Sequence, residues 1–426
     1  MSRVAATAVR GTRDVLPPES SSWQWAEGIA RRLCAQYHFQ EIRTPIFEGL
    51  EVFQRGIGET TDIVEKEMYV FQDRSERWLA LRPEGTAGVV RAFLEHGLPA
   101  GPLPVKFFYL GPMFRYERPQ AGRYRQFEQF GVEAFGSESP ALDVEIISLG
   151  TAFLEALGIS GWQVQLNTIG CPVCRPRYRQ RLLELLRPRA DQLCASCQSR
   201  LERNPLRVLD CKEESCRRVT ADVPAPEEYL CSECAAHWQA VQEGLRAVGI
   251  LYQVTPRLVR GLDYYTRTVF ELIAPGLGSQ DAVLAGGRYD GLVEEMGGPA
   301  VPGIGFAAGM DRLLLSLEQG GQGRAAEPEL DVFVARAGDV PETAALQVVQ
   351  ELRKQGWRVD QDYLGRSLKA QLKAADRAGA QLTLVLGEAE WAQGQVVVRT
   401  MATGEQETVN RAVLTQAVTT RLQRTA

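Results

Sequence analysis

The spacing of apolar residues predicts two helices in the first three quarters of the chain. Apolar residues recur at helical spacing over residues 142–157, and Ser139-Pro140 before them is favourable at a helix start. The members of this series are Leu142, Ile146, Leu149, Phe153 and Leu157. Residues 310–317 repeat the helical pattern after a glycine-rich turn, which predicts a second helix.

Residues 106–136 alternate in a way that predicts a long antiparallel hairpin. Two aromatic-rich runs flank a turn that contains Arg118, Pro119, Gln120 and Gly122. In an extended return strand, every second side chain points to the same face. One face then carries Arg123, Arg125, Phe127, Gln129 and Glu133, whereas the other carries the core-type residues Phe130, Val132 and Ala134.

This polar face has two interpretations. Charged alternation usually marks the solvated side of an edge hairpin. Here, however, Gln129 and Glu133 lie among apolar neighbours, and Arg115 on the first strand can reach the same face. Because a buried carboxylate is costly without a partner, we interpret the face as a binding site for a small polar ligand.

The last hundred residues have a different pattern. Residues 331–335, 381–386 and 395–399 are predicted strands, and residues 341–355 have helical spacing. Strands alternating with helices favour a small α/β domain with a mostly parallel sheet. A glycine-rich linker precedes it. The resulting division is a catalytic domain over 1–170 and 256–320, an insertion over 171–255, a linker over 321–328 and a C-terminal domain over 329–426.

Composition narrows the function classes. The 426 residues suggest about three domains, and 45% hydrophobic with 24% charged residues is ordinary for a globular protein. A net charge of −5 excludes a generally basic nucleic-acid coat but not a local basic groove. We found no run resembling a membrane span of ~20 apolar residues and no secretory signal, so no membrane partner and a cytoplasmic location are expected.

The insertion is marked by cysteine and by basic residues. It holds eight of the nine cysteines, and residues 171–220 carry twelve arginine or lysine residues against six acidic ones. The cysteines form the pairs Cys171/Cys174, Cys194/Cys197, Cys211/Cys216 and Cys231/Cys234. Two such pairs brought together make a tetrahedral zinc site, and reduced buried thiols are the alternative. The spacing does not reveal which pairs join, and His237 is a possible substitute ligand. Any zinc here would be structural.

The hairpin sequence FRYERPQAGRYRQFEQFGVEAFG resembles motif 2 of the class II aminoacyl-tRNA synthetases, in the form found in histidyl-tRNA synthetases. Further segments match that family in order: IRTPIFE at 42–48 resembles motif 1, RPEGTAG at 82–88 the amino-group loop, LVRGLDYYTRTVFE at 258–271 and AGGRYDGL at 285–292 the histidine signatures, and GFAAGMDRLL at 305–314 motif 3. The resemblance covers nearly the whole chain. It implies an α+β catalytic domain with an antiparallel sheet flanked by helices, an inserted mostly helical module and a C-terminal α/β anticodon-binding domain.

The same resemblance implies an ATP-dependent ligase that joins L-histidine to tRNA through an adenylate, with Mg²⁺ accompanying the ATP. Arg115, Arg260 and Arg312 are the expected catalytic residues, because fixed cations stabilise charge growing on phosphorus. The implied ATP-binding residues are Arg115, Arg123, Phe127 and Arg312, with the adenine between Phe127 and Arg312. The implied histidine-binding residues are Glu84, Thr86, Gln129, Glu133, Arg260, Tyr264 and Tyr265. A carboxylate and a phenol suit the one donor and one acceptor of a neutral imidazole.

The resemblance also implies macromolecular partners. Histidine tRNA is expected to contact Arg118 and Gln120 of the hairpin turn and the basic residues of the insertion, and motif 1 implies a homodimer. Several single-residue assignments have ordinary alternatives: Glu84 could be a helix-start carboxylate, and Asp311 stands where the class commonly has Glu. The rival function is a catalytically inactive paralogue that serves as the histidine-sensing regulatory subunit of ATP phosphoribosyltransferase. The retained arginines and the C-terminal domain favour the enzyme.

Overall fold

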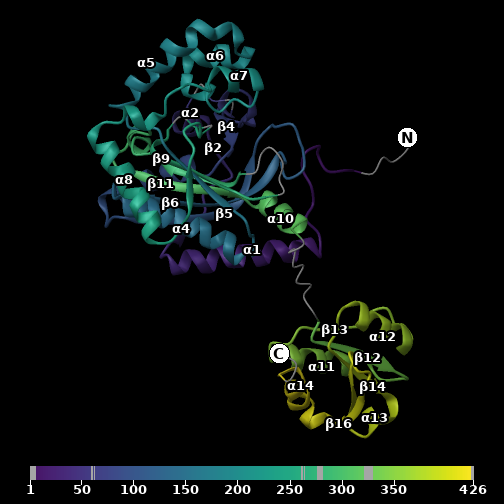
Figure 1. Ribbon diagram of the computed structural model, residues 1–426. Coiled ribbons are helices and arrows are strands. Elements are labelled where there is room, and N and C mark those ends of the chain that lie inside the picture. The colour runs from purple at the N-terminus through teal and green to yellow at the C-terminus, as the bar shows by residue number, and fades with distance from the viewer. Residues whose placement is uncertain are drawn as a thin grey trace, which may run out of the picture. The chain divides into compact units, whose positions relative to one another are not determined.

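The computed structural model describes residues 6–58, 61, 63–260, 262, 264–275, 282–320 and 330–423. The chain divides into two compact units, residues 1–324 and 325–426, and each has its own hydrophobic core (Figure 1). The linker expected at 321–328 lies outside the described residues. No helix among the described residues is both long and apolar enough to cross a membrane.

An eight-stranded sheet forms the centre of the first unit, in the order β1-β5-β6-β11-β10-β9-β7-β8. The strands are β1 (Gln40–Glu41), β5 (Val105–Phe114), β6 (Gln126–Phe135), β7 (Gln163–Thr168), β8 (Tyr252–Val254), β9 (Thr266–Ile273), β10 (Ala282–Arg288) and β11 (Gly303–Gly309). The central pairings are antiparallel, and only the edge strands β1 and β8 pair in parallel. The expected antiparallel sheet flanked by helices is confirmed.

The predicted hairpin is present as β5 and β6, which pair in continuous register from Val105 opposite Phe135 to Phe114 opposite Gln126. One face of the sheet is covered by helices whose buried residues join Phe130 and Val132 in the main core. These helices are α1 (Glu19–Gln36), α4 (Pro140–Ala156), α8 (Ser232–Ala247) and α10 (Met310–Gln319). Ser139 caps α4 as predicted, since its side chain accepts a hydrogen bond from Ala141 N. The other face carries Gln129 and Glu133.

A smaller three-stranded sheet lies near the N-terminal part of the chain, in the order β2 (Phe47–Gly49), β4 (Trp78–Leu81) and β3 (Val70–Gln72). Helices α2 (Leu50–Ile57), α3 (Thr86–Glu95) and α9 (Leu292–Glu295) pack beside it, together with η1 (Ile63–Glu67) and η2 (Leu98–Ala100). Several large apolar side chains of this sheet are exposed, Phe47 and Trp78 to 54% each.

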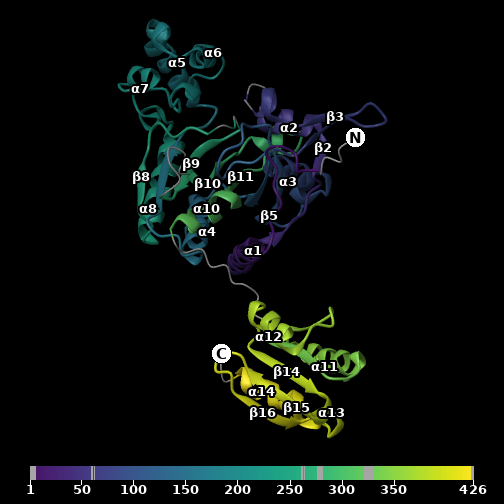
Figure 2. The same ribbon diagram turned by 90° about the vertical axis from the view of Figure 1, so that its right-hand side faces the viewer.

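The inserted module is helical and stands at one end of the first unit in both views (Figures 1 and 2). It contains α5 (Arg175–Leu186), η3 (Arg187–Gln192), α6 (Ala195–Arg203), η4 (Pro205–Val208), α7 (Glu214–Val219) and η5 (Pro226–Tyr229). These elements enclose a small core of their own. Helix α8 and strand β8, which fall inside the range expected for the insertion, instead pack in the main core and sheet, because Trp238, Val241 and Leu245 contact the catalytic core.

The second unit is a five-stranded sheet in the order β13 (Val359–Gln361), β12 (Val332–Ala337), β14 (Leu382–Gly387), β15 (Gln395–Thr400) and β16 (Gln406–Asn410). Its helices are α11 (Glu342–Lys354), α12 (Leu368–Arg377), α13 (Glu388–Ala392) and α14 (Leu414–Gln423), with η6 (Arg411–Val413). The first three strands are parallel, but β15 and β16 are antiparallel. The expectation of a mostly parallel sheet is therefore wrong for this half, because β15 returns antiparallel to β14 after the short helix α13 and a turn then joins it to β16.

Candidate active site

A pocket of about 750 Å³ opens on the sheet face opposite α1 and α4. All eleven residues expected at the ATP and histidine sites line it, although they come from five separate stretches of sequence. They are Glu84, Thr86, Arg115, Arg123, Phe127, Gln129, Glu133, Arg260, Tyr264, Tyr265 and Arg312. By contrast, Arg118 and Gln120 are exposed in the hairpin turn, outside this lining.

Glu133 forms the most deeply buried polar point of the pocket, with only 1% of its surface exposed. Its described partners are hydroxyls: Thr86 Oγ1 donates at 2.7 Å, Tyr109 Oη lies 3.5 Å away, and Tyr289 Oη also donates. Burial raises the pKa of Glu133 to about 8. Gly305 makes this arrangement possible, because a Cβ there would lie 2.1 Å from Glu133 Oε2. A carboxyl so placed is ready to share a proton with a ligand.

Gln129 and Glu84 lie near Glu133 but differ in their partners. Gln129 is 8% exposed, and its Oε1 atom has no hydrogen-bond partner among the described residues. Because an unpaired buried carbonyl is costly, this atom indicates a ligand donor such as an ammonium group. Glu84 accepts from the backbone N–H groups of Thr86 and Ala87 at 2.7 and 2.8 Å, so it caps α3 as well as facing the pocket.

Arginines gather at the mouth of the pocket. Arg115 donates to the Pro83 carbonyl at 2.8 Å and stands 5.4 Å from the ring centre of Phe127. Arg123 pairs with Glu117 at 3.0 Å. These contacts hold one guanidinium beside an aromatic face and restrain a second in the same pocket, an arrangement that suits a phosphate joined to a planar base.

Arg260 also lines the pocket, where an ion pair with Glu271 on β9 holds it. Its Nε atom is buried and has no hydrogen-bond partner among the described residues, so one donor stays available. Nearby, Tyr264 and Tyr265 are 7% and 5% exposed, and burial raises the pKa of Tyr265 to about 12. Tyr265 therefore remains a neutral hydroxyl at physiological pH.

The structure adds pocket residues that the sequence reasoning did not select. Tyr289 and Glu271 lie inside the recognised signature segments, but no role was assigned to them. The insertion contributes a wall of Arg207, Leu209, Asp210, Cys211, Lys212 and Arg217. The basic excess of the insertion was the available signal for this wall, but only the tertiary structure shows which of its cations reach the pocket.

Other predictions need correction. Arg125 does not share the polar face, because β6 begins only at Gln126; its guanidinium instead stacks 3.9 Å from the ring centre of Tyr116. His237 is not a ligand of the cysteines, since its Nε2 atom lies 3.6 Å from Asp143 Oδ2. Several basic residues of the insertion are paired internally, as with Arg187 to Glu202 and Arg189 to Asp222.

The side chains that could bind metal ions differ between the insertion, which offers cysteines, and the pocket, which offers carboxylates. The eight insertion cysteines form two groups of four, Cys171/Cys174/Cys231/Cys234 and Cys194/Cys197/Cys211/Cys216. Among the described residues, no comparable carboxylate group converges in the pocket. Asp311 already accepts from Glu128 N at 2.9 Å and pairs with Arg13 at 3.4 Å. A Mg²⁺ ion accompanying ATP would thus fit if phosphates and water supplied most of its ligands.

An antiparallel sheet with a motif 2 hairpin, a buried polar pocket and arginines converging at its mouth defines the catalytic domain of a class II aminoacyl-tRNA synthetase. The family model "Histidyl-tRNA synthetase" matches residues 11–313, and an "Anticodon binding domain" model matches residues 331–421. The chain belongs to the histidyl-tRNA synthetase family.

Individual relatives match over more than nine tenths of the chain. A histidine–tRNA ligase from Halothermothrix orenii is 53% identical over 94% of this chain and 95% of its own, and one from Desulforudis audaxviator is 54% identical with the same coverage. The crystal structure of apo S. aureus histidyl-tRNA synthetase superposes with a TM-score of 0.83 at 38% identity, covering 97% of this chain and all of that one.

Proposed function

We propose that this protein is a histidine–tRNA ligase. In the first step, the histidine carboxylate attacks the α-phosphate of ATP, so that a histidyl-adenylate forms and pyrophosphate leaves. In the second step, a terminal hydroxyl of the tRNA attacks the adenylate carbonyl, and AMP leaves. The observation that carries the proposal is the convergence of two kinds of polar group in one pocket: a buried carboxyl–phenol set and several arginines.

The inner part of the pocket is assigned to histidine. Glu133 and Tyr265 hold the imidazole, with Tyr264 beside them, while Gln129 accepts from the α-ammonium group together with Glu84 and Thr86. The unsatisfied Gln129 Oε1 atom supports this assignment. An amino acid with an apolar side chain would leave Glu133 and Tyr265 without partners, so it would be rejected.

The outer part is assigned to ATP. Arg115 and Arg260 both line the pocket and would hold the α-phosphate, where charge grows during the reaction. Phe127 and Arg312 would enclose the adenine, and Arg123 would contact the outer phosphates. Mg²⁺, when bound, neutralises phosphate charge. The ion pair with Glu271 restrains the Arg260 side chain at the pocket wall.

The tRNA is assigned to surfaces outside the pocket. Arg118 and Gln120 are exposed in the hairpin turn, where an acceptor end entering the pocket would pass. We assign the acceptor arm to the insertion, whose core elements span 171–230, and the anticodon to residues 329–426. A homodimer is supported by the exposed apolar residues of the small sheet, among them Phe47, Phe71 and Trp78. The location we propose is the cytoplasm.

The decisive experiment is exchange of labelled pyrophosphate into ATP, with each of the twenty amino acids and without tRNA. We expect exchange with histidine alone, followed by histidine transfer to tRNA when histidine tRNA is added. Histidine binding without any exchange would instead support the regulatory-subunit alternative. That alternative is disfavoured because Arg115, Arg123, Arg260 and Arg312 all line the pocket.

A further inference from the structure

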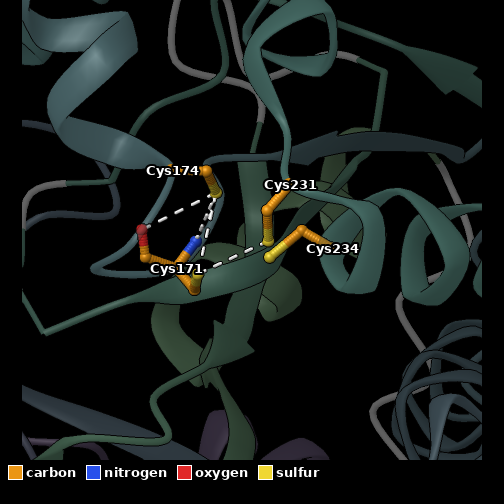
Figure 3. A group of neighbouring side chains, drawn as sticks. All are labelled: Cys171, Cys174, Cys231 and Cys234. Atoms are coloured by element: carbon orange, nitrogen blue, oxygen red, sulfur yellow. Dashed lines mark hydrogen bonds between the residues drawn. The ribbon is translucent and has the colours of Figure 1, made fainter.

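The eight insertion cysteines form two separate groups, and in the sequence all four residues of one group lie between the two pairs of the other. The outer group joins Cys171 and Cys174, which follow β7, to Cys231 and Cys234 at the start of α8. Figure 3 shows these four side chains pointing toward one another from the two segments. The inner group, Cys194/Cys197/Cys211/Cys216, lies wholly within the loop that the outer group closes.

The sulfur separations fit a metal ion at the centre of each group. A tetrahedral zinc ion with Zn–S bonds of ~2.3 Å sets its ligand sulfurs about 3.8 Å apart. The Sγ atoms of Cys171 lie 3.7 Å from Cys174 and 3.9 Å from Cys231, and Cys194 lies 3.9 Å from Cys211. A disulfide would require about 2.05 Å, and the nine cysteines are unpaired. A four-iron cluster stands between its ligands and would hold the sulfurs farther apart.

The backbone around the groups is arranged to support thiolates. Cys171 N lies 3.2 Å from Cys174 Sγ, and Cys194 N lies 3.2 Å from Cys216 Sγ, so each group receives an N–H donor. Such donors orient metal-bound sulfur. Gly170 has a φ of +69°, and a Cβ there would lie 2.6 Å from Cys174 Sγ. The turn that carries the first pair therefore requires glycine.

The two groups have different relations to the active-site pocket. The outer group fastens the points where the chain leaves and rejoins the catalytic domain. The inner group includes Cys211, which itself lines the pocket between Asp210 and Lys212. Arg207 and Lys212 of this wall line the same pocket as Arg123 and Arg312, on the side assigned to ATP.

We propose that the insertion binds two zinc ions, one in each group, and that the inner ion positions the Arg207–Lys212 wall of the nucleotide pocket. The positioning role rests on the function proposed above, whereas the two metal sites do not. The inner ion does not contact the reacting atoms; it fixes the segment from which these two cations extend. The outer ion fixes the base of the insertion.

The metal content of the full-length protein, purified reduced and without chelator, tests the first part. We expect two zinc equivalents per chain by mass spectrometry of the metals, and release of both when a mercurial modifies the thiols. Zinc-free protein, or iron in its place, would overturn the proposal. This measurement needs no variant, so it stands even where a cysteine variant fails to fold.

Paired variants then separate the two sites. Cys171→Ser with Cys231→Ser, and Cys194→Ser with Cys211→Ser, should each retain one equivalent. Cys34→Ala is the matched control, because Cys34 is buried in α1 outside both groups and its loss should leave two equivalents. If either double variant lost both ions or neither, the assignment of two independent sites would be wrong.

Kinetics of pyrophosphate exchange test the positioning role. Loss of the inner site should raise KM for ATP by about tenfold, with kcat and KM for histidine changed much less. Lys212→Ala should reproduce that increase while retaining both zinc ions. An unchanged KM for ATP in the inner-site variant would refute the positioning role alone. If wild-type protein held two zinc ions but showed no exchange, the proposed enzyme function would fail and the metal sites would remain.

Discussion

Glu133 shows how one buried residue sets the chemistry of the pocket. Its described partners are hydroxyls and include no cation, so an ionised carboxylate there is poorly stabilised and its pKa rises to about 8. Histidine brings an imidazole with an ordinary pKa of ~6.5. If Glu133 binds the imidazole as proposed, the pair is most stable when the two groups share one proton, located either on the carboxyl or on the imidazole.

This reasoning predicts a pH-dependent affinity for histidine. Between about 6.5 and about 8, the carboxyl is protonated and the imidazole neutral, so binding needs no proton exchange. Above about pH 8 the Glu133 carboxyl of the empty pocket loses its proton, and KM for histidine should rise by about tenfold per pH unit. Below about pH 6.5 the imidazole of free histidine gains a proton, and KM should rise again. KM for histidine, measured by pyrophosphate exchange from pH 5.5 to 9.5, should show both the acid rise (the lower limb) and the alkaline rise (the upper limb).

Glu133→Gln should have weaker affinity and should lose the rise in KM that begins near pH 8, because an amide does not titrate; only the rise due to the α-ammonium group of histidine should remain at higher pH. Glu128→Gln is the control: burial also raises the pKa of Glu128, to about 7, but it lies outside the pocket lining, so the upper limb should persist. An affinity that improves through pH 8 in wild-type protein would show that the ionised carboxylate is the binding form.

Arg260 permits a second prediction at this scale. Replacing it with alanine removes the cation that we assign to the α-phosphate, so kcat for exchange should fall by about 10²-fold or more. Arg260→Lys keeps the charge but not the planar fork and should recover only part of the loss. Near-normal exchange in Arg260→Ala would mean that the α-phosphate lies elsewhere.

At the scale of elements, regular alternation was predictable and irregular backbone was not. The period of two correctly assigned Phe127, Gln129 and Glu133 to one face, because these residues lie within β6. Arg125 was misplaced because it precedes the strand. The approach of Tyr289 to Glu133, by contrast, depends on β10 and β6 flanking β11, which no local pattern encodes. Which cysteine pairs come together could likewise be learned only from the tertiary structure.

Packing between elements depends on one buried ion cluster. Arg288 on β10 and Asp143 on α4 are both fully buried and paired, and His237 of α8 lies beside Asp143. Burial disfavours ionisation of Asp143, but the nearby His237 and Arg288 outweigh it and lower its pKa. The cluster thus joins α8, the helix that follows the inserted module, to the central sheet.

Arg288→Met should lower the free energy of unfolding by about 3–5 kcal/mol, because the buried Asp143 carboxylate would lose its guanidinium partner. The double variant with Asp143→Asn should recover much of this loss, since both charges are then absent. Urea unfolding, analysed with one m-value for all variants, measures the free energy of unfolding of the single and the double variant. Arg187→Ala is the control, because it removes only an exposed ion pair and should barely change the urea midpoint of unfolding. Equal destabilisation in the single and double variants would show that lost packing, not unpaired charge, is responsible.

The whole molecule divides its tasks between two units with separate cores. The pocket lies entirely within residues 1–324, whereas residues 331–421 match an anticodon-binding domain. Adenylate formation should therefore need only the first unit, whereas productive binding of tRNA should need both. A chain ending at residue 324 is therefore expected to keep pyrophosphate exchange within a few-fold of the full-length rate.

The same truncated chain should charge histidine tRNA with a kcat/KM reduced by about 10²-fold or more, because stacking of even two anticodon bases is worth ~3 kcal/mol. Circular dichroism and a thermal transition verify that it is folded, and adding excess residues 325–426 in trans should not restore charging, since the linkage supplies the effective concentration. If the folded truncated chain lost exchange as well, the second unit would have to act on the adenylation pocket itself. Retention of full charging would instead mean that the protein recognises histidine tRNA mainly at its acceptor end, through the insertion and the hairpin turn.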